Sequence, residues 1–400
     1  MYHIWCRTPR SDPRGNEFEG FMTTSSLPPF RVLSLDGGGM RGTYTATYLD
    51  RVGAAFAKRR GIAAVDIGAA FDLIVGTSTG GIIACALAAG VPLSEIVNLY
   101  VEHGPKIFSR SLPSGVVGVI PDGWKRPSAL AAGTEELRKA LTDKLGTTTL
   151  GDIYAARGIG IAIPAIEMSQ HRAWVFKTPH LKDTTNHRDD NYTLVDVCLA
   201  TTAAPIYRSM AAINHPDTSS SGFNVFVDGG LWANNPVLTG LIDALDMTVP
   251  GQEIQVFCLG TCPMPAGEQI TKSALDRGLA EWKFGGEAAS LAVDAQQFAY
   301  DHMAKKLARH VNRICTIIRF PSEKVPAALI PYLDLDETRA EAMEALINQA
   351  RTDADMTNSK CAYAETDVEA ALISGLFNTV PPRTDPLAFR TSSAAGAAVA

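Results

Sequence analysis

Ser78 is the residue whose surroundings in the sequence most clearly indicate chemistry. It lies in Gly76-Thr77-Ser78-Thr79-Gly80, directly after the apolar run Phe71–Val75 and before the apolar run Gly81–Ala88. This order predicts a buried strand, a tight turn and a helix, with the serine at the tip of the turn. Such a turn exposes the serine oxygen as a nucleophile, and its glycines leave room for a substrate. Because G-x-S-x-G strings also occur by chance in ordinary loops, a nucleophile needs support from elsewhere in the chain.

A second glycine-rich segment, Gly37-Gly38-Gly39-Met40-Arg41-Gly42, follows a predicted strand at 31–36 and precedes a predicted helix. Its spacing also satisfies the G-x-G-x-x-G pattern of dinucleotide-binding loops. That alternative requires an acidic residue about 20 positions further on, where the chain instead has the basic stretch Ala57–Gly61. Consecutive glycines expose backbone N–H groups that bind anions, so the segment is a candidate oxyanion hole for acyl transfer.

The third candidate is Asp228-Gly229-Gly230, at the end of a short β-rich run. Taken alone, Asp-Gly is a common turn dipeptide. As a functional residue, Asp228 would be a general base delivered next to the serine by the end of a strand. A carboxylate with an ordinary pKa is a weak base, so this role requires burial that raises its pKa.

A histidine base is not favoured by the order of the chain. Of the eight histidines, only His302 and His310 follow Asp228, and both lie in the predicted amphipathic helix Glu287–His310. A triad histidine normally lies in a loop beyond a strand, and a solvated helix face is the better account of these two. A dyad of Ser78 and Asp228 is the simplest remaining assignment.

Taken in this order, Asp36–Gly42, Gly76–Gly80 and Asp228–Gly230 resemble the three signatures of the patatin-like phospholipases. The resemblance covers roughly residues 31–245. It implies Ser78 as nucleophile, Asp228 as proton acceptor and Gly37–Gly42 as oxyanion hole, with Arg41 at the family's basic position. It also implies a metal-independent lipid acyl hydrolase of the phospholipase A type, which cleaves membrane glycerophospholipids without a cofactor.

Two other functions remain open from the sequence. Some bacterial patatin-like enzymes of similar size are antiphage effectors that degrade the inner membrane once a cyclic nucleotide activates them, and the layout of this chain is compatible with that role. A function of a different class is a nucleotide-binding switch, in which the Gly37–Gly42 loop would hold a phosphate. A cyclic-nucleotide activator and a homo-oligomer are therefore candidate partners beside the phospholipid substrate.

Composition limits the remaining classes of function. The 400 residues are 46% hydrophobic and carry a net charge of −6, which argues against broad electrostatic recruitment to a nucleic acid polymer or to an anionic membrane. The seven scattered cysteines favour reduced thiols in a cytoplasmic protein. No apolar run reaches the 18 or so residues of a membrane helix. The lipid substrate that the resemblance implies leads us to expect peripheral contact with the inner face of the membrane during activity. No group of residues has metal-ligand spacing, and no metal ion is expected.

Alternating strands and helices predict an α/β fold, with a mostly parallel sheet sandwiched by helices in a single enlarged domain. We expect a flexible segment at 1–30, in which Met22 is a candidate start, followed by a catalytic domain at 31–245. Residues 246–380 are expected to complete the core and to offer a regulatory or oligomerisation surface, and residues 381–400 are expected to form a disordered tail. Prolines and glycines at 104–133 predict a break in the helical pattern.

Overall fold

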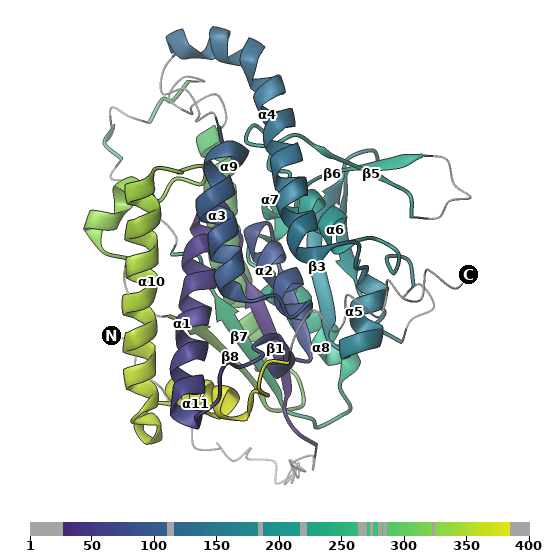
Figure 1. Ribbon diagram of the computed structural model, residues 1–400, viewed down its shortest axis with the longest axis vertical. Helices are drawn as coiled ribbons and strands as arrows, with labels where there is room; N and C mark the ends of the chain where they lie inside the picture. Colours follow the sequence, from purple (N-terminus) through teal and green to yellow (C-terminus); the bar gives the residue numbers. More distant parts are fainter. Residues whose placement is uncertain are drawn as a thin grey trace, which may run out of the picture.

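A mixed sheet organises the part of the chain that the computed structural model describes, which is residues 27–384 except for 110–115, 183–186, 217–221, 263–269, 273–274, 279–281, 283–285 and 322–324. The eight described strands are β1 (Phe30–Leu35), β2 (Leu73–Gly76), β3 (Gly160–Glu167), β4 (Arg172–Lys177), β5 (Ala211–Asn214), β6 (Phe223–Asp228), β7 (Ile254–Leu259) and β8 (Cys315–Phe320). They form one sheet in the order β5-β6-β3-β2-β1-β7-β8, with β4 also paired to β3 (Figure 1).

Parallel pairing runs from β3 through β2, β1 and β7 to β8, whereas β4 and β6 pair with β3 in the antiparallel sense. The described α-helices are α1 (Gly42–Arg60), α2 (Thr79–Ala88), α3 (Leu93–Ile107), α4 (Val116–Leu145), α5 (Leu150–Arg157), α6 (Leu194–Thr201), α7 (Gly230–Ala233), α8 (Val237–Met247), α9 (Gly286–Leu307), α10 (Ala340–Cys361) and α11 (Val368–Thr379). The predicted α/β class with a mostly parallel sheet is confirmed.

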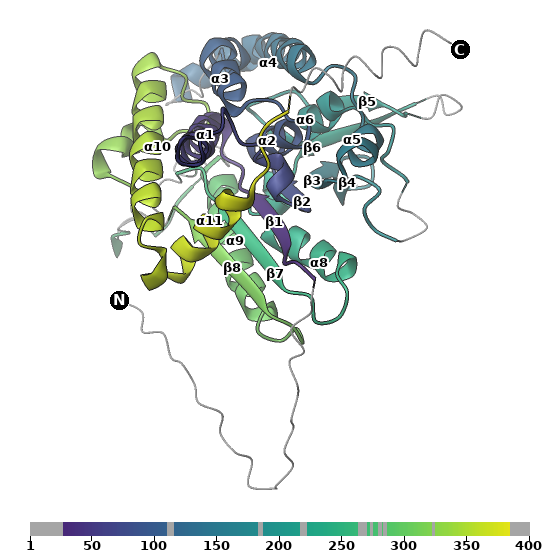
Figure 2. The same cartoon turned by 60° about the horizontal axis from the view of Figure 1, so that its bottom comes forward.

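Helices cover both faces of this sheet because its central strands are apolar on both sides. In β1, Leu33 and Leu35 join the core formed with α1, α2, α3 and α10, whereas Val32 joins a separate core with α8 and α9. The two views show α1, α3 and α10 together on one face and α8 on the other (Figures 1 and 2). No helix within the described residues is long and apolar enough to cross a bilayer.

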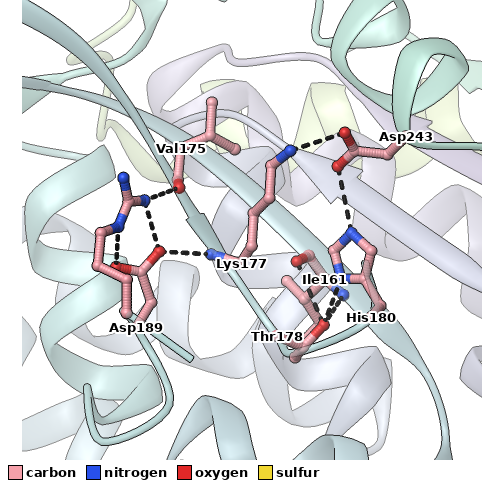
Figure 3. Close-up of polar contacts among 8 residues, drawn as sticks. Ile161, Val175, Lys177, Thr178, His180, Asp189 and Asp243 are labelled. Atoms are coloured by element: carbon pink, nitrogen blue, oxygen red, sulfur yellow. Dashed lines mark hydrogen bonds and ion pairs between the residues drawn. The ribbon is translucent and has the colours of Figure 1, made fainter. Parts of the chain in front are cut away.

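Strand β4 lies at an edge of the sheet, and neighbouring side chains cover its free backbone groups. The Lys177 amide donates to Asp189 Oδ2 at 3.0 Å, and Arg188 Nη2 donates to a β4 carbonyl at 2.7 Å (Figure 3). Beyond the strand, Asp243 of α8 contacts Lys177 Nζ at 2.7 Å and His180 Nε2 at 3.2 Å. These contacts block pairing with a foreign strand and tie the edge of the sheet to α8.

The structure differs from the sequence-based prediction in several elements. The predicted break at 104–133 is wrong in its described part, because α3 continues past Pro105 and α4 begins at Val116. Strand β5 and helices α5, α7 and α11 were not predicted. The six described cysteines are free thiols. Most of the terminal segments predicted to be flexible, 1–26 and 385–400, lies outside the described residues.

Candidate active site

The register between β1 and β2 brings the first glycine loop against Ser78. Leu35 lies opposite Gly76, so the parallel strands β1 and β2 end side by side and the segments that follow them are neighbours. The contact is close enough that a Cβ atom on Gly37 would lie 3.3 Å from Ser78 Cβ. The strand-turn-helix order predicted around Ser78 is confirmed, with β2 before the turn and α2 starting at Thr79.

Ser78 adopts the strained backbone conformation that its position in the turn predicts. Its φ is 54° and its ψ is −123°, a region that residues with a side chain rarely occupy. The Ser78 amide donates to Thr201 Oγ1 at 2.9 Å, and that hydroxyl in turn donates to Pro164 O at 2.6 Å. Such strain costs roughly 1–3 kcal/mol and persists where its surroundings enforce it, here through Thr201.

Asp228 lies next to Ser78 because β2 and β6 both pair with the same edge of β3. Strand β2 pairs with the first residues of β3 in the parallel sense, and β6 pairs with its last residues in the antiparallel sense. The carboxyl ends of β2 and β6 therefore meet. Ser78 Oγ donates to Asp228 Oδ2 at 2.7 Å, and the Gly230 amide donates to Asp228 Oδ1 at 2.7 Å.

The Asp228 carboxylate has the electrostatic environment that a base near neutral pH requires. Asp228 is 5% exposed, and burial raises its pKa to about 6. The hydrogen bonds from Ser78 and Gly230 and the charge of Arg208 act in the opposite direction and limit the rise. The carboxylate is therefore ionised at neutral pH, but it is a stronger base than an exposed aspartate.

Only part of the Gly37–Gly42 loop has free backbone donors. The Gly37 amide donates to Asn234 O at 2.9 Å, and the Met40 amide donates to Leu335 O at 2.8 Å. Arg41 and Gly42 also donate to carbonyls within the loop. Among the described residues, the Gly38 and Gly39 amides make no hydrogen bond, so the candidate oxyanion donors narrow to these two.

Arg41 turns back onto its own loop. Its Nε donates to Gly38 O at 3.3 Å, and burial lowers the pKa of its guanidinium against the attraction of Asp294 and other acidic groups. The side chain thus contacts the candidate oxyanion loop and not Ser78.

Gly39 has a left-handed backbone conformation and lies close to the Leu335 carbonyl, so a side chain at this position should destabilise the fold. Its φ is 57°, and a Cβ would lie 2.2 Å from Leu335 O. Gly61 is a matched control because its φ is 66° but no atom lies within 4 Å of the same position. We expect Gly61→Ala to cost about 1 kcal/mol in the free energy of unfolding and Gly39→Ala at least about 2 kcal/mol more, as measured by urea denaturation. Equal losses would contradict the predicted clash.

A buried charge network that the sequence did not reveal supports the start of the glycine loop. Asp36, fully buried at the end of β1, accepts hydrogen bonds from Arg319 Nη1 at 2.6 Å and Gln297 Nε2 at 3.0 Å. Arg319 Nε also donates to Asp301 Oδ1 at 3.2 Å. Burial would lower the pKa of Arg319, but the attraction of Asp36 holds it above the usual value. Helix α9 and strand β8 thus fix the residue that precedes Gly37.

Histidine does not take part in this constellation within the described residues. The Ser78 hydroxyl bonds to Asp228, and the two histidines after Asp228, His302 and His310, are exposed. The buried His180 pairs instead with Thr178 and Asp243 at the edge of β4. The geometry therefore contains a serine–aspartate pair beside a glycine loop, an arrangement suited to acyl transfer.

Comparison with known proteins agrees with this geometry. A family model described as patatin-like phospholipase matches residues 33–241. A protein from Pseudomonas aeruginosa named cGAMP-activated phospholipase is 36% identical, over 70% of this chain and 76% of the relative. Proteins of the same name from Escherichia coli and Vibrio cholerae are 33% and 28% identical, over 58% and 80% of this chain and 62% and 89% of their own lengths. With this match over half of its length and its three signatures gathered around one turn, the chain belongs to the patatin-like phospholipase family.

Proposed function

We propose that this chain hydrolyses fatty-acyl esters of glycerophospholipids through a dyad of Ser78 and Asp228. Asp228 takes the hydroxyl proton of Ser78 as the Ser78 oxygen bonds to the ester carbonyl carbon. The Gly38 and Gly39 amides stabilise the negative charge on the carbonyl oxygen. When the tetrahedral intermediate collapses, the bond to the glycerol oxygen breaks, and Asp228 returns its proton to that oxygen.

In the second half of the cycle, a water molecule hydrolyses the acyl-enzyme. Asp228 takes a proton from a water molecule that attacks the acyl-enzyme, and the bond between Ser78 and the acyl group then breaks. Ser78 regains its proton, and a free fatty acid leaves. One carboxylate serves as base and then as acid in each half, a role for which a pKa of about 6 is well suited.

A single observation carries this proposal. The Ser78 hydroxyl donates to Asp228 at 2.7 Å from a strained turn that lies against the Gly37–Gly39 segment. A nucleotide-binding switch is less well supported, because the Gly37, Met40 and Arg41 amides already bond within the protein and leave few donors for a phosphate. Fluorophosphonate labelling discriminates the two functions: an activated Ser78 is modified, whereas a phosphate-binding loop is not.

The pH dependence of hydrolysis tests the role of Asp228. Because only the ionised carboxylate accepts a proton, kcat/KM should rise about tenfold per pH unit below a pH of about 6 and level off above it. A soluble short-chain ester, assayed between about pH 5 and pH 8, avoids changes in a lipid surface. A profile that is flat across this range would contradict Asp228 as the base.

Control by a cyclic nucleotide is a second candidate function, favoured by the three bacterial relatives named cGAMP-activated phospholipases. In this proposal the chain is an antiphage effector that acts from the cytoplasm on the inner face of the membrane, and the activator drives it into a homo-oligomer. Phospholipid vesicles and purified protein, with and without cGAMP, provide the test. Activity and oligomeric state that both ignore cGAMP would contradict it, while Ser78-dependent hydrolysis would still support the esterase.

A further inference from the structure

Arg208 lies buried beside Asp228, in the segment that links α6 to β5. The residue is 5% exposed, and its amide donates to Ala204 O at 2.8 Å. The same stretch of chain begins with Thr201, the acceptor for the Ser78 amide. Arg208 is therefore held by the segment that also shapes the turn around Ser78.

The charge of Arg208 has no anionic partner within ion-pair distance in the described part of the protein. Among the described residues, the one hydrogen bond of its side chain, from Nη2 to Thr134 Oγ1 of α4, is long at 3.4 Å, and its buried Nε donates to no acceptor there. Burial lowers the pKa of Arg208 to about 10, so the guanidinium still carries its charge at neutral pH. Because a buried cation without a partner is costly, this position favours an anion from outside the described protein.

The relation of Arg208 to the Ser78–Asp228 dyad indicates the chemical class of this anion. Coulomb attraction between Arg208 and Asp228 opposes the effect of burial on the pKa of both groups. The Asp228 oxygens are nevertheless occupied by Ser78 and Gly230 and form no ion pair with Arg208. The Asp228 amide donates to Ala203 O at 3.1 Å, and the Arg208 amide donates to the next carbonyl along the chain, Ala204 O. The backbone therefore brings Arg208 near the dyad, while the described contacts of its guanidinium do not include Ser78 or Asp228.

A second arginine contacts the segment that holds Arg208. Arg126 of α4 is 8% exposed, and its Nη1 donates to Ile206 O at 3.4 Å, two residues before Arg208.

We propose that Arg208 binds the phosphodiester of the lipid whose acyl ester Ser78 attacks, an inference that rests on the proposed esterase function. In a glycerophospholipid, the phosphodiester and the acyl ester are joined by the short glycerol backbone, so a bound substrate places an anion close to the reacting carbonyl. The planar guanidinium can donate from Nε and an Nη atom to two phosphate oxygens at once. Arg208 thereby selects phospholipids over neutral glycerolipids with the same acyl chains.

Two soluble lipids with the same acyl chains, one with a phosphocholine head group and one with a free hydroxyl in its place, test this selection. The substrates are dihexanoyl phosphatidylcholine and dihexanoylglycerol, both below the concentration at which they form micelles, with and without cGAMP. For Arg208→Gln, we expect kcat/KM on the phospholipid to fall about 10- to 100-fold while kcat/KM on the neutral lipid changes little. Arg208→Lys, which keeps the charge but loses the planar fork, should retain part of the preference.

The matched control is Arg157→Gln, which removes a partly buried arginine at the far end of α2, where it bonds Leu87 O, Ala88 O and Asp66. This variant should leave the ratio of the two kcat/KM values unchanged. Equal losses on both lipids in Arg208→Gln, or a pH profile shifted equally on both, would overturn the proposal, because Arg208 would then act on Asp228 or on the fold. An unchanged ratio would overturn it as well.

Ligand binding to the inactive Ser78→Ala variant shows whether the phosphodiester that Arg208 contacts belongs to the phospholipid or to cGAMP. This measurement does not depend on enzyme activity. Adding Arg208→Gln to that variant should weaken binding of the phospholipid, measured by calorimetry, and leave binding of cGAMP unchanged. Weaker binding of cGAMP alone would assign Arg208 to the activator and overturn a lipid subsite. If the unaltered protein hydrolyses neither lipid in a Ser78-dependent way, the esterase function fails, and this binding comparison still decides the role of Arg208.

Discussion

Replacing Ser78 by alanine is expected to lower fatty-acid release from phospholipid vesicles by about 10⁴-fold or more, because no other group can form the acyl-enzyme. Asp228→Asn should lower the rate by about 10²- to 10⁴-fold, since the amide keeps the shape of the side chain but cannot accept the Ser78 proton. The double variant should be little worse than Ser78→Ala, because the two residues act as one unit.

A remote serine is the control for these two variants. Ser359 lies on the exposed face of α10 and donates to Asp355 O at 2.9 Å. Ser359→Ala should retain full hydrolysis, and all variants should keep cooperative thermal unfolding. Fatty-acid release near the parental rate from either Ser78→Ala or Asp228→Asn would rule out the dyad, whereas a loss accompanied by unfolding would show only that the variant is unstable.

Replacing Arg319 by methionine is expected to lower the free energy of unfolding by about 3–5 kcal/mol. This change leaves the fully buried Asp36 without the cation that bonds it at 2.6 Å, and an uncompensated buried charge is strongly destabilising. Burial already raises the pKa of Asp36 against the attraction of Arg319, and removing that cation raises it further. A carboxyl whose folded-state pKa is raised stabilises the fold most at low pH, so the loss should grow as pH rises from about 5 to about 8.

An exposed ion pair supplies the control for Arg319. Arg51 bonds Asp355 at 2.8 Å, with both side chains about half exposed, and Arg51→Met should cost no more than about 1 kcal/mol. Urea denaturation at the two pH values measures both variants. The combination Asp36→Asn with Arg319→Met should recover part of the loss, because it removes the unpaired carboxylate of Asp36. A loss in Arg319→Met as small as that in Arg51→Met would contradict the network.

Local sequence patterns predicted most of the elements around the site because those elements are long or strongly apolar. The strand before Ser78 and the helix after it are buried along their whole length, and a continuous apolar run reports such burial directly. Prediction failed where packing outweighs local propensity. Helix α4 forms through a proline-rich stretch and packs on α3, and the short β5 depends on pairing with β6.

The sequence by itself determined the candidate chemistry of this protein: a serine in a tight turn, a glycine loop and an aspartate, each at the end of a strand. Three-dimensional folding alone decided how they meet. The carboxyl ends of β2 and β6 converge on one edge of β3, and burial raises the pKa of Asp228. Within the described part of the chain, backbone hydrogen bonds leave the Gly38 and Gly39 amides as the free donors of the loop. The roles of Arg319 and Arg208 also emerge only from the fold, because burial and the distance between charges depend on contacts between residues far apart in the chain.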